Sequence, residues 1–420
     1  MTPRMVPWLD RSEPTLLVLS QVYVPDAAAV GQHMHDAAVE MVRRGYRVIA
    51  IASDRGYEDP SRSYPRYERL DGVHVVRLPW SSFGKSSIKM RLVGGGMFVS
   101  EAVLLAAALA RVDGILVSTS PPMCSLAALA LARRHRAPVT FWAMDINPDQ
   151  IVALGTLGAD ALPVKGFDWM NRRILRRARR VVALDRFMAE RLQAKWPIAD
   201  KLAIVPPWPP IDAPADLLPH ADNPFRAQHG LNGKFVIMYS GNLSPVHPVT
   251  TVLEAARSLR ADPRFEFVFI GGGLGRAEID EHVRRHELRN VRTLPYQPQS
   301  LLSQSLSAAD VHLVSMGNDM VGIVHPSKIY GAMAVGRPLL VLGPKRSHVG
   351  ELVDAHGIGL QVEHGDVAGV EAALRTMAEM EPAQREAFGR RARAAVDAHY
   401  ARAEVCARFA DVLEGTLDSC

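Results

Sequence analysis

The stretch HPSKIYGAMAVGRPLLVLGP, residues 325–344, decides how the rest of the chain is interpreted. Its Pro-Ser-Lys start, apolar middle and Gly-Arg-Pro end predict a helix, and LLVLG predicts a strand directly after it. Ser327 occupies the expected N-cap position, and the helix start beyond it should carry free backbone N–H groups and partial positive charge. Lys328 adds a full charge, and Gly331 keeps one helix face small. We expect a phosphate-bearing ligand here, at the carboxyl end of a parallel sheet; the alternative is an ordinary capped helix between two strands.

The motif PSKIYGAMAVGRP, residues 326–338, resembles the nucleotide-sugar-binding helix of family 4 (group 1) glycosyltransferases. These are retaining enzymes of the GT-B fold, and the closest resemblance is to the branch that builds bacterial exopolysaccharide and O-antigen repeat units. In the wider family one glutamate of this helix contacts the ribose, and another, eight positions earlier, lies near the donor sugar. Here Gly331 and Ile323 stand at those places, so the sequence leaves open whether activity is altered.

Length and composition limit the number of domains and the class of protein. A chain of 420 residues is expected to form two domains, and 48% hydrophobic with 22% charged residues is a soluble globular composition. The three cysteines are far apart, which indicates neither a disulfide framework nor a zinc site and suits a reducing cytosol. The first residues lack the apolar core of a signal peptide. We therefore expect a cytoplasmic protein with a short disordered lead-in.

Apolar strand-length runs alternate with helical patterns in both halves of the chain. TLLVLS at residues 15–20, a helix, and RVIAIAS at residues 47–53 form a βαβ unit, and residues 234–259 repeat strand, glycine loop and helix. The proline-dense segment 206–224 separates the halves. The fold class is α/β, and the resemblance implies GT-B: two Rossmann-like doubly wound domains facing across a cleft, with a C-terminal helix crossing back to the first. We assign residues 1–13 to the lead-in, 14–205 to the N-terminal acceptor-side domain, 206–224 to the linker, 225–395 to the nucleotide-sugar domain and 396–420 to the returning helix, part of one long helix from Pro382 to Leu417.

In the first half, the candidates lie where predicted strands end. Gly31 and Gln32 stand at a loop-to-helix junction, where a missing side chain lets a ligand approach or simply allows a tight turn. The segment from Asp145 to Pro148 resembles the family's D-x-x-P loop, which implies that Asp145 is catalytic and faces the donor sugar or the acceptor. Asp149 is assigned to the acceptor side. The alternative is that Asp145 only caps a helix or orders its loop. The spacing of the two carboxylates does not match a metal-binding DxD.

In the second half, the resemblance assigns donor contacts to loops that follow strands. Asn242 and His247 stand near places where family members commonly carry an arginine and a lysine that neutralise the diphosphate, so Lys328 is expected to carry most of that charge and to be catalytic. Tyr296 and Gln297 match the loop that recognises the nucleobase, although a plain strand exit is equally compatible with the sequence. The full set of expected donor-binding residues is Gly241, Asn242, His247, Gly272, Gly273, Tyr296, Gln297, Ser327, Lys328 and Ile329.

The expected reaction is a metal-independent transfer of a hexose from a nucleoside-diphosphate sugar, such as a UDP-sugar, to a saccharide, with retention of configuration. The nucleotide sugar is a co-substrate, and no other cofactor is expected. The donor should bind between the domains, and the resemblance implies an acceptor that is often linked to polyprenyl diphosphate. The sequence does not identify the base, the sugar, the acceptor, the linkage or the oligomeric state. A nucleotide-sugar epimerase or hydrolase of the same fold, and a non-catalytic scaffold, remain alternatives.

Two basic stretches make an anionic membrane surface a candidate partner. NRRILRRARR, residues 171–180, is predicted to form a helix, and Lys85, Lys89 and Arg91 precede a long apolar run. Solvated helix faces are the alternative. Nucleic acid is not expected, because no aromatic residues are interleaved with the arginines.

Overall fold

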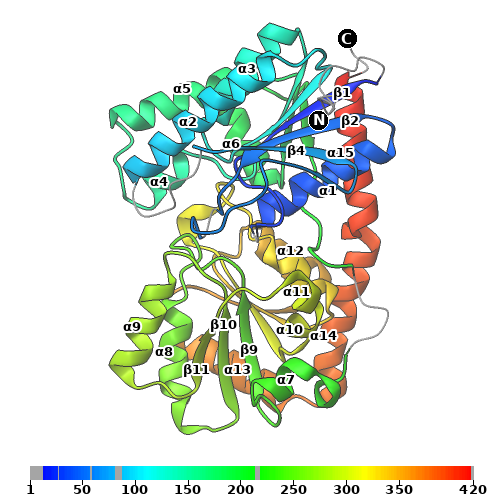
Figure 1. Ribbon diagram of the computed structural model, residues 1–420. Coiled ribbons are helices and arrows are strands. Elements are labelled where there is room, and N and C mark those ends of the chain that lie inside the picture. Colours follow the sequence, from blue (N-terminus) through cyan, green and yellow to red (C-terminus); the bar gives the residue numbers. More distant parts are fainter. Residues whose placement is uncertain (1–12, 27, 57–58, 81–87, 213–217, 418–420) are drawn as a thin grey trace. The chain divides into compact units, whose positions relative to one another are not determined.

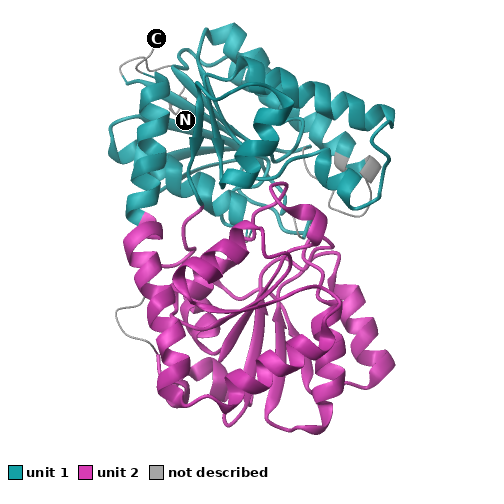
Figure 2. Cartoon of the chain, turned by 180° about the vertical axis from the view of Figure 1, so that it is seen from behind, with its two compact units in different colours: residues 1–206, 403–420 teal, residues 207–402 magenta. Residues whose placement is uncertain are grey.

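A computed structural model describes residues 13–26, 28–56, 59–80, 88–212 and 218–417. The chain divides into two compact units, unit 1 with residues 1–206 and 403–420 and unit 2 with residues 207–402 (Figure 2). Most of the expected lead-in and Lys85 lie outside the described residues, as do residues 213–217 of the expected linker. Each unit is an α/β domain, so the predicted fold class is confirmed at this level.

Unit 1 contains an eight-stranded sheet in the order β3-β4-β2-β1-β5-β6-β7-β8, parallel except for the β3–β4 hairpin. The order turns back between β1 and β5, which is where open α/β sheets bind ligands. The strands are β1 Thr15–Leu19, β2 Arg47–Ser53, β3 Tyr67–Leu70, β4 Val73–Leu78, β5 Gly114–Ser118, β6 Val139–Trp142, β7 Arg180–Ala183 and β8 Leu202–Ile204. The helices are α1 Ala29–Arg43, α2 Ile88–Ala107, α3 Cys124–His135, α4 Asp149–Ala153, α5 Leu162–Arg177, α6 Arg186–Lys195 and α15 Arg402–Leu417 (Figure 1).

Unit 2 contains a six-stranded parallel sheet in the order β11-β10-β9-β12-β13-β14, which turns back between β9 and β12. The strands are β9 Phe235–Ser240, β10 Phe265–Ile270, β11 Val291–Leu294, β12 Val311–Ser315, β13 Leu339–Leu342 and β14 Gly359–Val362. The helices are α7 Pro224–Gln228, α8 Thr250–Ser258, α9 Arg276–His286, α10 Leu302–Ser307, α11 Lys328–Ala334, α12 His348–His356, α13 Val367–Glu379 and α14 Pro382–Ala395.

The central strands are apolar along their whole length because helices cover both faces of these sheets. Strand β10, FEFVFI, is buried at every position. Its one charged residue, Glu266, is compensated by the neighbouring strand, since Arg292 Nε donates a 2.6 Å hydrogen bond to Glu266 Oε1. An unpaired carboxylate at this depth would be strongly destabilising.

The long C-terminal helix predicted from Pro382 to Leu417 is interrupted. Helix α14 continues into a π-helical turn, Val396–Tyr400, and Ala401, with ψ of 126°, leaves the helical conformation before α15 begins. Helix α15 then packs on unit 1, where the Phe409 ring lies 4.0 Å from the Trp142 ring. Arg44, the residue directly after α1, donates a 3.0 Å hydrogen bond to the Ala407 carbonyl. The break allows α14 and α15 to belong to different units.

The predicted arginine helix is also shorter than expected. Helix α5 ends at Arg177, Ala178 has an extended backbone, and Arg180 already begins β7. Not all of the arginines are free for a partner, because Arg172 Nε donates a 2.6 Å hydrogen bond to Asp168 Oδ2. Among the helices that the structure describes, none is both long enough and apolar enough to span a bilayer.

Candidate functional site

The site in unit 2 is built on the carboxyl ends of β9, β10 and β12, because strand β9 lies between the other two. Parallel strands deliver their following loops to one edge of the sheet. The loop after β9 begins at Gly241, the loop after β10 begins at Gly271, and the connection after β12 leads into α11.

The two glycine loops interlock so closely that side chains would not fit. A Cβ atom built on Gly271 would lie 2.0 Å from the Gly241 carbonyl oxygen, and Gly271 has φ of +142°. Leu243 N–H donates a 2.7 Å hydrogen bond to Gly272 O, and Gly275 N–H returns a 2.9 Å bond to Leu243 O. Gly273 also has a positive φ, +116°. The glycines expected at the donor site therefore form one continuous layer of closely packed, half-buried backbone.

Lys328, the first residue of α11, lies beside this layer. A Cβ atom built on Gly241 would be 3.3 Å from Lys328 Cε. The lysine Nζ lies 3.9 Å from the centroid of the Tyr239 ring and donates a hydrogen bond to the Tyr239 hydroxyl. That hydroxyl donates in turn to the Asn242 carbonyl at 2.7 Å. Tyr239 was not predicted as a site residue, yet it links the cation to the glycine loop.

The electrostatics of this cluster suit an incoming anion. Burial lowers the pKa of Lys328 well below its ordinary value, and burial raises the pKa of Tyr239. Burial also lowers the pKa of His247, and the nearby Lys328 charge lowers it further. His247 Nδ1 is buried and has no hydrogen-bond partner among the described residues. Burial deprives the charged lysine of its hydration. A bound diphosphate would stabilise the charged form again through its negative charge.

The start of α11 differs from the predicted N-terminal anion site. Ser327 has helical backbone angles and its side chain makes no capping hydrogen bond. The backbone N–H of Ile329 donates to Pro326 O at 3.2 Å, and that of Tyr330 donates to Ser327 O at 3.1 Å. The prediction of free amides at the helix start was therefore wrong for these two groups. The Ile329 side chain is fully buried, so it has no surface to offer a ligand. The positive charge of this site comes mainly from the Lys328 ammonium.

Ile323 and Gly331, which stand where the resemblance would place glutamates, are both packed against other parts of the chain. Ile323 is 2% exposed. A Cβ atom on Gly331 would lie at ordinary contact distance from Leu306 and Pro210, 3.4 and 3.5 Å away. The small face predicted from Gly331 thus lies against these two residues of the same unit.

Two histidines near the helix start were not predicted as site residues. His325 Nε2 and His348 Nε2 lie 3.0 and 2.8 Å from the Tyr330 hydroxyl, which joins them. Their sequence separation gives no local pattern, because the contact depends on how α11 and α12 pack.

Tyr296 and Gln297 follow β11, one strand beyond β10. The Gln297 side chain donates a 2.9 Å hydrogen bond to Pro295 O, which orients the loop. Tyr296 contributes to the raised pKa of Tyr239, so the two hydroxyls influence each other electrostatically. This loop is therefore on the same edge of the sheet as Lys328, and its assignment to the nucleobase stays a prediction.

In unit 1, the candidates also lie at one edge of the sheet. Gly31 is required by packing, since a Cβ atom there would lie 3.1 Å from Tyr23 Cα; Gln32 is the next residue of α1. Asp145, after β6, is exposed, and its backbone N–H donates to Thr119 Oγ1 at 3.3 Å.

Asp149 has a structural partner. Its Oδ2 lies 2.7 Å from Lys195 Nζ, and the same ammonium lies 2.7 Å from Asp168 Oδ1. These contacts join α4, α5 and α6, which explains Asp149 without an acceptor. Its assignment to the acceptor side stays a prediction.

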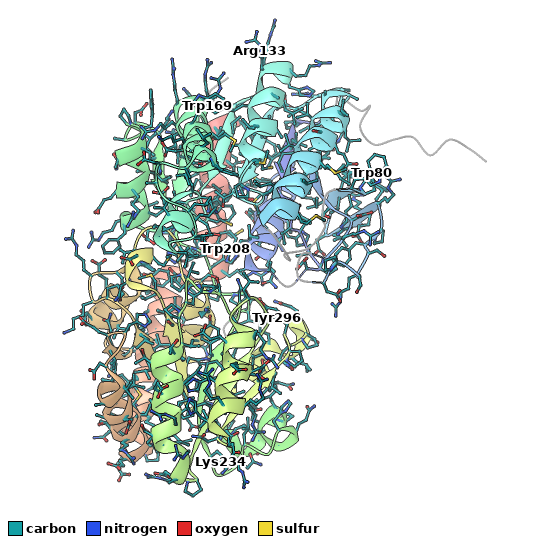
Figure 3. All side chains as sticks on the ribbon, turned by 90° about the vertical axis from the view of Figure 1, so that its left-hand side faces the viewer. Trp80, Arg133, Trp169, Trp208, Lys234 and Tyr296 are labelled. Carbon is teal, nitrogen blue, oxygen red and sulfur yellow. The ribbon has the colours of Figure 1, made fainter. Side chains whose placement is uncertain are left out.

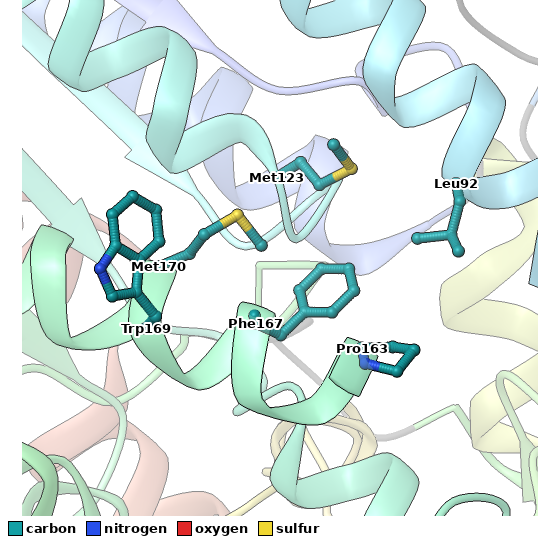
Figure 4. Close-up of a pocket in the computed structure, with 7 residues that line it drawn as sticks. Leu92, Met123, Pro163, Phe167, Trp169 and Met170 are labelled. Atoms are coloured by element: carbon teal, nitrogen blue, oxygen red, sulfur yellow. The ribbon is translucent and has the colours of Figure 1, made fainter. Parts of the chain in front are cut away.

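An exposed apolar groove of about 320 Å³ lies on unit 1 between α2 and α5 (Figure 4). Its walls are Leu92, Met123, Pro163, Gly166, Phe167, Trp169 and Met170. Around it, Leu162 is 84% and Trp169 55% exposed, and the Arg173 guanidinium lies 5.2 Å from the Trp169 ring centroid. Large apolar side chains gathered on a surface in this way mark an interaction site more often than isolated ones do.

Comparison with known proteins matches nearly the whole described chain to two domain models. Residues 28–208 match the glycosyl transferase 4-like domain, and residues 222–395 match the glycosyl transferases group 1 domain. Among curated proteins, the chain is 26% identical over 381 residues to WcaI of Escherichia coli (strain K12), named for glycosyl transfer in colanic acid biosynthesis, covering 86% of this chain and 91% of that protein. It is also 26% identical over 215 residues to the glycosyltransferase WbjE of Pseudomonas aeruginosa, covering 51% and 53%.

Solved structures of glycosyltransferases share the fold at low sequence identity. Sucrose-phosphate synthase of Thermosynechococcus elongatus superposes with a TM-score of 0.77 at 15% identity, over 97% of this chain and all of that one. HepE of Anabaena, in complex with UDP and glucose, gives 0.70 at 16% identity, over 95% and 99%. WaaG, involved in lipopolysaccharide biosynthesis, gives 0.69 at 15% identity, over 95% and 100%. The GT-B fold predicted from the sequence is thus confirmed.

Proposed function

Since the chain belongs to the glycosyltransferases that join a 4-like domain to a group 1 domain, we propose that it moves a hexose from a UDP-sugar to a saccharide acceptor during exopolysaccharide synthesis. The transfer proceeds with retention and without a metal ion. The choice of nucleotide is supported by HepE, whose complexes contain UDP and UDP-glucose, and the choice of pathway class by WcaI.

The observation that carries the proposal is the Lys328 ammonium held at the Gly241–Asn242 loop by Tyr239. The diphosphate of the donor lies over the backbone of the two glycine loops, where the absence of side chains permits close approach. It accepts hydrogen bonds from Lys328, and the base lies toward Tyr296 and Gln297.

During transfer, the bond between the anomeric carbon and the β-phosphate oxygen breaks and the acceptor oxygen bonds to that carbon. The electron pair of the broken bond leaves with the phosphate, and Lys328 stabilises the developing negative charge. The acceptor attacks from the face that the nucleotide leaves, so configuration is retained. Its hydroxyl proton passes to the leaving phosphate, and Asp145 orients the acceptor or the donor sugar. Each step uses a group of the chain or of the substrates, which makes a metal unnecessary.

The acceptor saccharide is carried on polyprenyl diphosphate at the inner face of the membrane. The apolar surface around the groove between α2 and α5 supports this assignment. Its exposed side chains, Leu162 and Trp169, would insert at the boundary between lipid headgroups and acyl chains. Arg173 and Arg177, both exposed on α5, would attract anionic headgroups.

A turnover assay tests the proposal. The purified chain is incubated with UDP-, GDP- and dTDP-hexoses, with and without a lipid-linked saccharide and with and without EDTA, and nucleotide release and the anomeric configuration of the product are measured. We expect acceptor-dependent release of UDP, a retained linkage and no effect of EDTA. Release without acceptor would favour a hydrolase or epimerase, and binding without release would favour a scaffold.

A further inference from the structure

Helices α8 and α9 are the two helices that directly follow the glycine loops of unit 2, and they run side by side (Figure 1). Thr250 Oγ1, at the start of α8, donates a 2.9 Å hydrogen bond to Glu278 Oε1 near the start of α9. One helical turn further along both helices, Glu254 Oε1 lies 3.7 Å from His282 Nε2. The helices are therefore parallel and in register, so a second pair of polar side chains is placed opposite each other.

His286 lies next to Glu254 and His282 and forms a group of three with them. It lies four residues after His282 on α9, and the two rings are 4.6 Å apart. One ligand atom from each of Glu254, His282 and His286 can be chosen so that all three lie within 4.8 Å of one another. His282 Nε2 is buried, yet it makes no hydrogen bond among the described residues. The 3.7 Å between this nitrogen and the Glu254 carboxylate oxygen is too long for a hydrogen bond. An ion bound to both atoms would satisfy the buried nitrogen.

We infer that Glu254, His282 and His286 form a binding site for a transition-metal ion of the Zn²⁺ class. Two imidazoles and one carboxylate are a donor set that zinc uses, with water as the fourth ligand. Tetrahedral bonds of about 2.0–2.1 Å place ligand atoms about 3.3 Å apart. The Glu254–His282 distance is already close to that value, and the half-buried His286 ring closes the remaining gap by side-chain rotation.

The surroundings of the three residues orient them for this role. Arg257 Nη2 lies 2.7 Å from Glu254 Oε2, which engages one carboxylate oxygen and leaves Oε1 toward His282. Partners of this kind orient metal ligands in known sites. The Arg257 charge opposes a dication, so we expect moderate affinity.

A metal here has a structural role, separate from the transfer reaction. It would bridge α8 and α9 about one turn, or 6 Å along the axis, beyond Thr250. Because the preceding loops form the glycine layer, the bridge would hold that layer together. The inference does not depend on the proposed function, since it can be tested without any sugar.

The test is titration of the full chain with Co²⁺ and Zn²⁺. Tetrahedral Co²⁺ gives visible absorption, Zn²⁺ should displace it at a stoichiometry of one, and calorimetry and thermal unfolding give affinity and stabilisation. We expect His282→Ala, His286→Ala and Glu254→Gln each to weaken binding at least tenfold and to abolish the rise in melting temperature. His356→Ala, a half-buried histidine elsewhere in unit 2, should bind as the wild type does.

Circular dichroism of each variant without metal separates lost binding from lost folding. The inference would be overturned if both histidine variants bound the metal with the affinity of the wild type. It would also be overturned if the wild type bound close to no metal ion per chain. Binding that requires the histidines but not Glu254 would overturn the bridge between the helices.

Discussion

The Nζ atom of Lys328 lies 3.9 Å from the centroid of the Tyr239 ring and donates a hydrogen bond to the hydroxyl of the same tyrosine. Tyr239 is 1% exposed at the end of β9, so it has little freedom to move. The aromatic face and the hydroxyl together compensate part of the lysine's lost hydration. The lysine side chain is thereby held at the glycine layer before any ligand arrives, which lowers the entropy cost of binding a diphosphate.

Replacing Lys328 with alanine should weaken UDP binding roughly 10- to 150-fold. The estimate corresponds to about 1.5–3 kcal/mol for one hydrogen bond to a charged group. Calorimetric titration with UDP measures it. Lys234→Ala is the control, because that exposed lysine donates to Pro263 O and lies at the other end of unit 2 (Figure 3). Unchanged affinity in Lys328→Ala would remove the basis of the proposed donor site.

Nucleotide binding should be accompanied by proton uptake above neutral pH. The pKa of Lys328 in the folded protein lies well below its ordinary value of 10.5, so between the two values the unfolded chain holds a proton that the folded chain lacks. Stability of the ligand-free protein therefore rises with pH in that interval. A bound diphosphate raises the lysine pKa again, and up to one proton should enter with each nucleotide.

Calorimetry at alkaline pH, below the ordinary lysine pKa of 10.5, in buffers of different ionisation enthalpy measures that proton. Lys328→Met should bind with less uptake, and any remainder would come from His247, whose pKa is also lowered. Identical uptake in the wild type and in Lys328→Met would show that the lysine stays neutral or was already charged.

The sequence predicted the architecture well because the information is local. Runs such as TLLVLS and RVIAIAS are apolar throughout, and the structure places them in β1 and β2, both buried at every position. The glycine loops were identified by their position after strands, and Lys328 by its position at the expected start of a helix. The break at Ala401 was not, since alanine favours helix and the change of unit is a tertiary effect.

The parts of the site that could not be predicted depend on contacts between distant segments. Tyr239 was not singled out, because its contact with Lys328 depends on how β9 and α11 pack. The amides of Ile329 and Tyr330 were expected to be free, but turn hydrogen bonds from the preceding residues occupy them. The Glu254–His282 contact joins positions on two helices and leaves no motif in the sequence.

Replacing Gly271 with alanine should destabilise the protein by about 3 kcal/mol or more. The new Cβ would lie 2.0 Å from the Gly241 carbonyl oxygen, and the backbone would have to keep a φ that alanine rarely adopts. Urea unfolding measures the loss. Gly233→Ala isolates the backbone effect, because its φ is +75° with open space around it, and should cost about 1 kcal/mol. Equal losses in the two variants would mean that the loops separate easily.

Replacing Asp145 with asparagine should lower kcat about 100-fold and change the affinity for UDP less than about twofold. The reason is that the carboxylate is proposed to orient the reacting groups on unit 1, whereas the nucleotide binds to unit 2. Steady-state kinetics and calorimetry measure the two quantities. Asp160→Asn, an exposed carboxylate paired with Lys165, should leave both unchanged. A normal kcat in Asp145→Asn would reduce Asp145 to a residue that orders its loop.

Vesicle binding should depend on the apolar surface between α2 and α5. Leu162 and Trp169 project from unit 1 with 84% and 55% of their surface exposed, and Trp169 is visible in Figure 3. Burying a large apolar side chain contributes about 1.5–3 kcal/mol, so Leu162→Ser with Trp169→Ala should weaken binding to phosphatidylglycerol-containing vesicles at least about tenfold in co-sedimentation. Ile204→Ser, a half-exposed residue on edge strand β8, controls for the loss of any apolar side chain.

Charge should matter at the same surface and be separable from apolar contact. Arg173→Gln with Arg177→Gln should reduce binding most at low salt and with the highest fraction of anionic lipid, because each basic side chain near such a surface contributes about 1 kcal/mol. Arg133→Gln with Arg134→Gln removes the same charge from the end of α3 and should have little effect. If both double variants lose affinity equally, the attraction comes from net charge alone. If neither the arginine nor the apolar variants lose affinity, the membrane contact lies elsewhere or does not form, and the acceptor must then reach the enzyme without its lipid surface.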